Sequence, residues 1–322
     1  MAAPIFVVGT PRSGTTWLAN MLCRHSRVEC VHEVTNDGRK VVNESAFFSY
    51  VTGKFGDLKN DNNLIQLIET FEASTFFILS GIDKSILYKS RPRTYHDFFR
   101  YLMDQVAEKK GADFWLEKTP SHTFHLFEMA RWYPDAKFII MKRDIVDQIK
   151  SFIKLVEIIS GINVEDLSFI KKKVTIFVRI FKYYAHCKHL DYFIAKNDSK
   201  IYQIEYEDLR ESTAGAIQSL CSFVGIDFEE GILNQTYVPN TSFQSNADRS
   251  SVLTPAEIKG IKILGKLIGL LPYRFYRLIY LTKRFLEGRK FPYWFFSYNI
   301  EKYGWSNVFG EGHERIKGTS EN

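Results

Sequence analysis

The sequence predicts an α/β protein with a central parallel β-sheet flanked by helices. Short apolar runs suit strands that are buried on both faces, and segments with helical spacing of apolar residues separate them. This alternation is typical of parallel sheets, because each crossover between parallel strands needs a long connection, usually a helix. The runs that we interpret as strands are Ile5–Val8, Val28–Val31, Phe114–Leu116, Lys137–Met141 and Lys200–Ile204.

Helices are predicted where apolar residues recur every three or four positions. The first follows a tight turn after the first strand, and its apolar stripe is Trp17, Leu18, Met21 and Leu22. Later helices are predicted over residues 145–158, 171–195 and 214–224. The segment 41–110 is rich in Phe and Ile and is interpreted as a mostly helical insertion.

The composition fits a soluble globular protein. Of the 322 residues, 45% are apolar and 25% are charged, and the net charge is +6. That charge suits an anionic ligand or surface but is too small for a protein that coats nucleic acid, so no nucleic-acid partner is expected. The four cysteines have no CxxC spacing, and we expect reduced thiols rather than a disulfide framework at Cys23, Cys30, Cys187 and Cys221.

No targeting segment is predicted. A strand-like run begins at Pro4, and no basic segment precedes it, so we expect no secretory signal and a cytoplasmic protein. Residues 263–282 come closest to a membrane span, but they include Lys266, Arg274, Arg277 and Pro272. Charges at bilayer depth are costly, so we expect no transmembrane helix. Two placements remain open: helices packed on the main domain, or a basic, aromatic segment in peripheral contact with a membrane surface.

A glycine-rich loop follows the first predicted strand. Gly9 and Gly14 have the G-x-x-x-x-G spacing of a P-loop, in which backbone N–H groups and the next helix N-terminus hold a phosphate. A nucleoside triphosphatase has Lys directly after the second glycine, where this chain has Thr15. The cation here is Arg12, inside the loop. The loop is therefore P-loop-like, but it suits an anion without a metal better than a magnesium–triphosphate complex.

The segment Pro11–Leu18 resembles the 5′-phosphosulfate loop of sulfotransferases that use 3′-phosphoadenosine 5′-phosphosulfate (PAPS). In that family the loop normally has the order Lys or Arg, Ser, Gly, Thr, Thr. The resemblance implies that PAPS is the co-substrate, that no metal takes part, and that this loop holds the 5′ end of the nucleotide. The implied contacts are Arg12, Ser13, Gly14, Thr15, Thr16 and Trp17.

Two further motifs follow in the family's order. The strand Phe138–Met141 is followed by Arg143 and then by Ser151, which resembles the family's 3′-phosphate element. An Arg at the carboxyl end of a strand can donate two hydrogen bonds to a phosphate, and a Ser about two turns into the next helix lies near the same face. The segment Ile204–Leu209 resembles the family's Tyr-Glu-Asp-Leu segment, and this implies that Tyr206 lies against the adenine.

The C-terminal part of the chain departs from the family's cytosolic branch. That branch has an Arg-Lys-Gly element that holds the 3′-phosphate, whereas Arg289-Lys290 is followed here by Phe291. Residues 240–243 are more similar to the corresponding loop of the carbohydrate and protein-tyrosine branches. The departure argues against a phenol or steroid acceptor.

We expect a single sulfotransferase domain over residues 1–322. Its nucleotide-binding core comprises residues 1–40 and 111–230, which hold the predicted strands. Residues 41–110 are the helical insertion, and residues 231–322 are a helical C-terminal extension on the acceptor side. Acceptor specificity is expected in the insertion and the extension, where the resemblance to the family fades.

Sulfuryl transfer needs cations around the leaving phosphate and a base for the acceptor hydroxyl. Arg12 is the first expected cation, and Lys118, in a segment that resembles the family's Glu-Lys-Thr-Pro, is the second. The cytosolic branch has its catalytic His two residues after that lysine, where this chain has Pro120. Glu33 is the expected base, because it lies 21 residues after Arg12, as the catalytic Glu does in protein-tyrosine sulfotransferases. The alternative bases are His32 and His122.

The predicted activity is transfer of a sulfuryl group from PAPS to a hydroxyl on a glycan, lipid, peptide or metabolite. A P-loop small-molecule kinase is the first alternative, and a metal chelator would abolish its activity. A non-catalytic protein that binds PAPS or adenosine 3′,5′-bisphosphate is the second alternative. Such a protein would bind the nucleotide without transferring sulfate.

Overall fold

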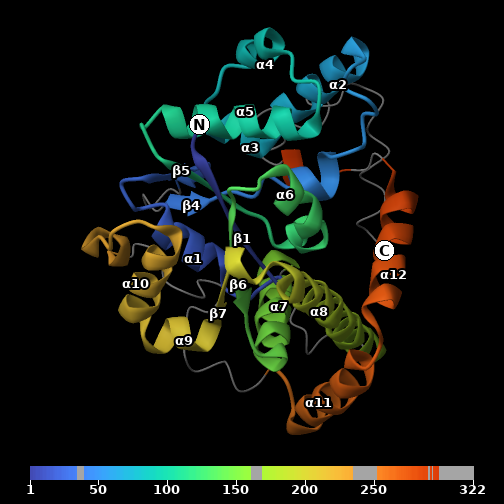
Figure 1. Cartoon of the computed structure of the whole chain (residues 1–322). Coiled ribbons are helices and arrows are strands. Elements are labelled where there is room, and N and C mark those ends of the chain that lie inside the picture. The colour runs from blue at the N-terminus through green and yellow to red at the C-terminus, as the bar shows by residue number, and fades with distance from the viewer. Residues whose placement is uncertain (35–39, 161–168, 235–251, 289–290, 292, 297–322) are drawn as a thin grey trace.

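The computed structural model describes residues 1–34, 40–160, 169–234, 252–288, 291 and 293–296. Its centre is a five-stranded sheet with the strand order β2-β5-β1-β6-β7 (Figure 1). All neighbouring strands in this sheet are parallel, which confirms the predicted fold class. The strands are β1 (Ala3–Gly9), β2 (Val28–Cys30), β5 (Phe114–Lys118), β6 (Lys137–Lys142) and β7 (Ile201–Glu205), and each overlaps a predicted strand.

Helices cover both faces of this sheet. Along β1, Ile5 and Val7 pack in one core with residues of α1, α9 and α10, whereas Phe6 and Val8 pack in the opposite core with the insertion. A strand buried on both faces has no polar side to display, and this explains its continuous apolar sequence. The covering helices are α1 (Thr15–Leu22), α6 (Leu126–Trp132), α7 (Ile145–Ser160), α8 (Phe169–Asn197), α9 (Tyr206–Glu211) and α10 (Thr213–Val224), with the shorter η2 (Pro120–His125), η4 (Asp198–Lys200) and η5 (Glu230–Leu233).

The insertion is mostly helical, as predicted, but it is preceded by a small hairpin. In this hairpin β3 (His32–Val34) pairs antiparallel with β4 (Lys40–Val42). The insertion's Phe content forms a shared core with the sheet, in which Phe47 stacks on Phe99 with ring centroids 4.7 Å apart. Its helices are η1 (Phe47–Val51), α2 (Asp61–Glu72), α3 (Thr75–Ser80), α4 (Ser85–Ser90) and α5 (Tyr95–Glu108).

The C-terminal region forms α11 (Pro255–Gly269), α12 (Tyr273–Glu287) and η7 (Tyr293–Phe296). Thr254 and Glu257 form a capping box at the start of α11, and Glu257 also pairs with Lys172 of α8 at 2.9 Å. Pro272 caps α12, so residues 263–282 are divided between two helices. Among the described residues, no helix combines the length and the apolar character that crossing a bilayer requires.

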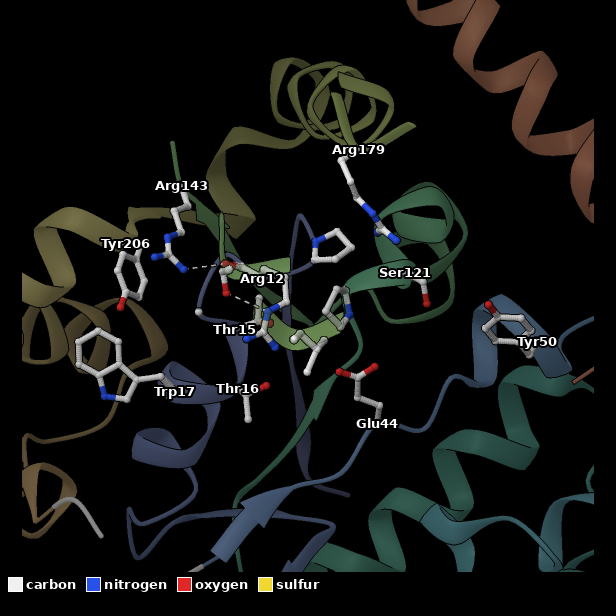
Figure 2. A pocket seen from close by; sticks show the side chains of 15 residues that line it. Arg12, Thr15, Thr16, Trp17, Glu44, Tyr50, Ser121, Arg143, Arg179 and Tyr206 are labelled. Atoms are coloured by element: carbon white, nitrogen blue, oxygen red, sulfur yellow. Dashed lines mark hydrogen bonds between the residues drawn. The ribbon is translucent and has the colours of Figure 1, made fainter. Parts of the chain in front are cut away.

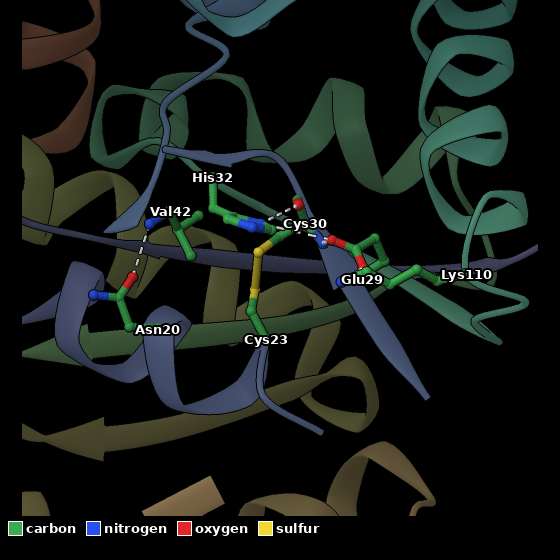
Figure 3. Close-up of a disulfide and its surroundings, with 7 residues drawn as sticks. All are labelled: Asn20, Cys23, Glu29, Cys30, His32, Val42 and Lys110. Atoms are coloured by element: carbon green, nitrogen blue, oxygen red, sulfur yellow. Dashed lines mark hydrogen bonds and ion pairs between the residues drawn. A yellow bond between two sulfur atoms is a disulfide. The ribbon is translucent and has the colours of Figure 1, made fainter. Parts of the chain in front are cut away.

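The prediction of reduced thiols at all four cysteines is wrong for one pair. Cys23 and Cys30 form a disulfide, with their Cα atoms 6.0 Å apart (Figure 3). Cys23 lies at the C-terminal end of α1 and Cys30 ends β2, so the reversal of the chain between helix and strand brings the two together. Their spacing in the sequence matches no disulfide motif. The pairing depends on how the chain folds between α1 and β2. Cys187 and Cys221 are free, as expected.

Three histidines are buried where α8, η2 and α12 meet. His186 and His189 of α8 contact the ring of Phe124, which also stacks on Tyr280 of α12 at 4.2 Å. His125 of η2 bonds through Nε2 to the hydroxyl of Tyr280 at 2.6 Å. Burial lowers the pKa of His125 and of His189 to about 4 and that of His186 to about 3.

Folding stability is therefore expected to fall as the pH drops below about 6.5. The unfolded chain binds protons at these histidines near their ordinary pKa, whereas the folded protein keeps them neutral until about pH 4. Three such groups give a slope of about 3 to 4 kcal/mol per pH unit between roughly pH 6 and pH 4.5. Denaturant unfolding across this range measures it. His186→Leu should reduce the slope by about a third, and an unfolding free energy that is equal at pH 5 and pH 7 would contradict the interpretation.

Candidate active site

A cavity of about 500 Å³ lies beyond the carboxyl ends of β1 and β6, in the size range of small-molecule sites. After β1, the chain first forms β2 and β5 on one side of β1 and later forms β6 and β7 on the other side. Such a reversal of strand order is where α/β sheets form ligand crevices. The cavity walls come from the loop after β1, the start of α1, and residues of η2, α7, α8 and α9.

The loop after β1 has a backbone that depends on its two glycines. A Cβ on Gly9 would lie 2.5 Å from the carbonyl oxygen of Met141, and one on Gly14 would lie 2.6 Å from the ring of Tyr206. Gly14 has φ 95° and caps α1 without a side chain, and the first turn of α1 has no acidic residue. The N–H groups and the dipole of this helix end therefore face the cavity without a competing carboxylate.

Side chains from distant segments hold this loop in place. Thr123 of η2 donates to the carbonyl oxygen of Gly9 at 3.2 Å. Arg143 donates through Nη1 to the carbonyl oxygen of Arg12 at 3.0 Å, and Arg12 donates through Nε to Ser151 Oγ at 3.0 Å. The first two motifs of the sequence, which are more than a hundred residues apart, thus meet through direct hydrogen bonds.

One end of the cavity combines aromatic rings with a guanidinium group. The guanidinium carbon of Arg143 lies 4.0 Å from the centroid of the Tyr206 ring. Trp17 meets the same ring edge-on, with centroids 5.7 Å apart. Figure 2 shows these three side chains grouped beside the loop. Flat rings next to a fixed cation suit a nucleobase that carries a phosphate group nearby.

The opposite end of the cavity contains Glu44, Tyr50 and Ser121 (Figure 2). Glu44 Oε1 accepts a hydrogen bond from Lys118 Nζ at 2.6 Å. The Lys118 side chain is only 3% exposed and is not among the described residues that line the cavity. Its link to the cavity is the ion pair with Glu44. A carboxylate at this end is placed to contact a polar group of a bound molecule.

Eight of the nine residues predicted to hold the nucleotide line this cavity. They are Arg12, Gly14, Thr15, Thr16, Trp17, Arg143, Ser151 and Tyr206. Ser13 is the ninth; its side chain is buried, and its hydroxyl has no hydrogen-bond partner among the described residues. The local sequence motifs therefore place nearly the whole set around one space.

The predicted bases lie elsewhere. Glu33 is exposed on β3 and is absent from the described lining of the cavity. His32 is half-buried and bonds through Nδ1 to the carbonyl oxygen of Cys30 at 3.2 Å, and burial lowers its pKa. In the described structure, neither residue lines the cavity.

His122 is fully buried, and both of its ring nitrogens are occupied. Nδ1 lies 2.8 Å from Glu117 Oε2, and Nε2 accepts the backbone N–H of Phe48 at 3.2 Å. Burial alone would raise the pKa of Glu117, but His122 and hydrogen bonds from Thr119 and Ser45 lower it below its ordinary value. This network ties η1 to η2 and positions the segment between Lys118 and Ser121.

Seven lining residues were not among the predicted site residues, and four of them have polar side chains that can contact a ligand: Glu44, Tyr50, Ser121 and Arg179. Arg179 belongs to α8, and its guanidinium carbon lies 3.1 Å from the centroid of the Phe152 ring. Burial lowers its pKa to about 10, so it remains charged at neutral pH. Its Nε atom has no hydrogen-bond partner within the described part of the chain. In the sequence it is one of many basic residues in a long helix, and its spacing gives no signal.

Comparison with known proteins agrees with this geometry. A family model described as the sulfotransferase family matches residues 4–230, about two thirds of the chain. The chain belongs to the sulfotransferase family. This sulfotransferase has no match among curated proteins. The matched range includes all five strands of the sheet, apart from the first residue of β1, and every predicted contact to the nucleotide.

Several solved structures are similar to this sulfotransferase. The sulfotransferase domain from the curacin biosynthetic pathway is 18% identical, with 88% of this chain and 97% of that chain covered and a TM-score of 0.45. Sulfotransferase STF1 from Mycobacterium tuberculosis is 17% identical, with coverages of 84% and 77% and a TM-score of 0.47. Mouse sulfotransferase SULT7A1, solved in complex with PAP, is 13% identical, with coverages of 83% and 88% and a TM-score of 0.44.

Proposed function

We propose that this sulfotransferase transfers the sulfuryl group of PAPS to a hydroxyl of a glycan, lipid, peptide or metabolite. The observation that carries the proposal is the single cavity in which the Arg12 loop, the Arg143–Ser151 pair and the Tyr206–Trp17 rings meet. One adenosine nucleotide can span these groups, because direct contacts connect them. A magnesium–triphosphate complex would lack the lysine that contacts its phosphates in a P-loop, because Thr15 occupies the position after the second glycine.

The proposed donor lies along the cavity with its adenine at Tyr206 and Trp17. Its 3′-phosphate meets Arg143 and Ser151, and its 5′ end lies over the loop amides and the hydroxyls of Thr15 and Thr16. The sulfuryl group then points toward Glu44. The acceptor enters from the side of Tyr50 and Ser121, which line the remaining end of the cavity.

Arg179 adds a cation on the side of α8. In the family's cytosolic branch, an Arg-Lys-Gly element supplies additional contacts to the 3′-phosphate. The two segments that were compared with this part of the family, residues 240–243 and 289–290, both lie outside the described residues. The unpartnered Nε of Arg179 supports a role in binding an anionic oxygen of the donor from another direction.

The reaction moves a neutral SO₃ unit between two oxygens. The acceptor oxygen forms a bond to sulfur while the bond from sulfur to the bridging phosphate oxygen breaks. The bridging oxygen leaves with the electron pair, and adenosine 3′,5′-bisphosphate is the product. Arg12 and the helix dipole of α1 stabilise the negative charge that develops on that oxygen. The rest of the rate enhancement comes from the cavity, which aligns the reacting groups.

We propose Glu44 as the base that takes the acceptor proton. Glu44 lines the cavity at the acceptor end, whereas Glu33, the base implied by the family resemblance, does not line it in the described structure. Lys118 holds the Glu44 carboxylate through their 2.6 Å ion pair and adds positive charge near the transferred group. The assignment requires no movement of β3.

Binding of adenosine 3′,5′-bisphosphate and of adenosine 5′-monophosphate, measured by calorimetry, tests the donor assignment. Arg143→Ala should weaken the bisphosphate about tenfold to a hundredfold, the usual loss for a charge-assisted hydrogen bond. The monophosphate should lose less affinity, because it has no 3′ group and is affected only through the contacts of Arg143 with the Arg12 carbonyl oxygen and the Tyr206 ring. Equal losses for both nucleotides would contradict the placement of the 3′-phosphate.

A transfer assay tests the reaction itself. Incubation with labelled PAPS and pooled glycans, lipids, peptides and phenols should give a labelled product, with the same yield in the presence of a metal chelator. Binding without transfer to any pool would favour a non-catalytic nucleotide-binding protein. Loss of activity in chelator would contradict a metal-free reaction.

A further inference from the structure

Helix α12 presents its apolar side to solvent. The side that faces the protein carries Tyr273, Tyr276 and Tyr280, which are buried or half-buried. Tyr276 donates to the carbonyl oxygen of Ile268 at 2.5 Å, and Tyr273 stacks on Tyr192 of α8 at 4.3 Å. Docking of α12 thus uses tyrosine rings and hydrogen bonds, so aliphatic residues are left for the other side.

The outer side of α12 is strongly exposed. Leu278 is 64% exposed, Phe285 is 85% exposed and Leu286 is 74% exposed. Leu278 and Phe285 are seven residues apart and therefore lie on one stripe of the helix, with Leu281 between them. Amphipathic helices of globular proteins normally turn this stripe toward the core. Large apolar patches that remain exposed mark interaction sites.

Helix α11, which directly precedes α12 in the chain, also has exposed apolar residues and adds positive charge. Its exposed side combines lysines with apolar residues: Lys259, Lys262, Ile263, Lys266 and Leu267, with Leu270 at the C-cap. Residues 255–287 contain seven Lys or Arg and two Glu, a net charge of +5 out of +6 for the whole chain. Of these cations Arg284 points inward, where it donates to the carbonyl oxygen of Thr52. Glu257 pairs with Lys172 and Glu287 with Lys283, so neither acid faces outward alone. Figure 1 shows both helices at the outer edge of the molecule.

We propose that the outer sides of α11 and α12 bind a bilayer surface that contains anionic lipids. The exposed Leu and Phe side chains enter the boundary between headgroups and acyl chains. The lysines of α11 lie among these residues, and their long side chains can reach the phosphate groups while the apolar residues insert. Positive charge spread among apolar side chains over two helices complements an anionic membrane, which presents phosphate groups and acyl chains over the same area. The inference depends on this surface alone and not on the identity of the sulfuryl donor.

Co-sedimentation of the full chain with vesicles tests this proposal. We compare vesicles of phosphatidylcholine with vesicles of phosphatidylcholine mixed with phosphatidylglycerol. The wild-type protein is expected to bind the mixed vesicles more tightly, and added salt should weaken this binding. Lys262→Gln combined with Lys266→Gln should lower the partition coefficient about thirtyfold, since each charge contributes about 1 kcal/mol.

Leu278→Ser combined with Phe285→Ser tests the apolar contribution. The expected partition into mixed vesicles falls at least about tenfold, because both side chains enter the interface. Both residues are exposed, so circular dichroism and the thermal midpoint should not change. The matched control is Tyr88→Ser with Lys89→Gln on α4, which removes an exposed aromatic and a charge far from α11 (Figure 1) and should bind like wild type.

Three results would overturn the proposal. The first is no binding of the wild-type protein to mixed vesicles. The second is an equal loss in the α4 control, which would show that binding is not localised to α11 and α12. The third is a wild-type dimer in analytical ultracentrifugation that the Leu278→Ser, Phe285→Ser variant converts to a monomer. That result would assign the surface to a second copy of the chain.

Discussion

Arg12→Ala is expected to lower kcat about a hundredfold to a thousandfold, while the affinity for adenosine 3′,5′-bisphosphate falls much less. The guanidinium group lies in the loop that cradles the 5′ end and is held by Ser151 at 3.0 Å. Its charge stabilises the bridging oxygen mainly as the bond to sulfur breaks. Removing the charge therefore costs the transition state more stabilisation than it costs the bound ground state. Steady-state kinetics and calorimetry on the same preparation measure the two effects.

The backbone makes this variant a clean test. Arg12 has φ 73°, a left-handed conformation that costs alanine about as much as arginine, so the substitution adds no new strain. Arg12→Lys keeps a positive charge and should recover part of kcat. Ser151→Ala removes the hydrogen bond to Arg12 without removing the charge, and its kcat should stay much closer to wild type. Equal losses of kcat and bisphosphate affinity in Arg12→Ala would contradict the assigned role.

The elements that could be predicted from the sequence are those that local chemistry determines. The short run Ile5–Val8, ended by Gly9, suits a strand buried on both faces, and the two glycines are needed because β6 and Tyr206 approach the loop closely. Arg143 and Ser151 could be placed near one ligand because their segment resembles the family's 3′-phosphate element, and strand ends and helix starts meet at one edge of a parallel sheet. Each of these inferences uses one short segment and the geometry of its own element.

The features that were missed depend on how distant segments pack. Glu44 reaches the cavity because the β3–β4 hairpin and the buried Glu117–His122 network position the residues around it. Arg179 is one of several basic residues of α8, and its role depends on the packing that places its guanidinium group against the ring of Phe152. The Cys23–Cys30 pair requires the crossover from α1 to β2. Spacing in the sequence carries no information about any of these contacts.

Glu44→Gln is expected to lower kcat about a hundredfold to ten-thousandfold, the usual contribution of a general base. The amide keeps the size of the side chain and can still accept the hydrogen bond from Lys118, so the fold and the wall of the cavity remain. It cannot take the acceptor proton. Binding of adenosine 3′,5′-bisphosphate should be unchanged, because no contact to the nucleotide is removed.

Glu33→Gln is the matched control, because the same change is made at the residue that the family resemblance implies. With Glu33 exposed on β3 and outside the described lining of the cavity, this variant is expected to retain nearly full kcat. The opposite pattern, an inactive Glu33→Gln and an active Glu44→Gln, would assign the base to Glu33. It would also mean that β3 moves toward the loop when the donor binds, since in the present arrangement only Glu44 of the two carboxylates lies at the acceptor end.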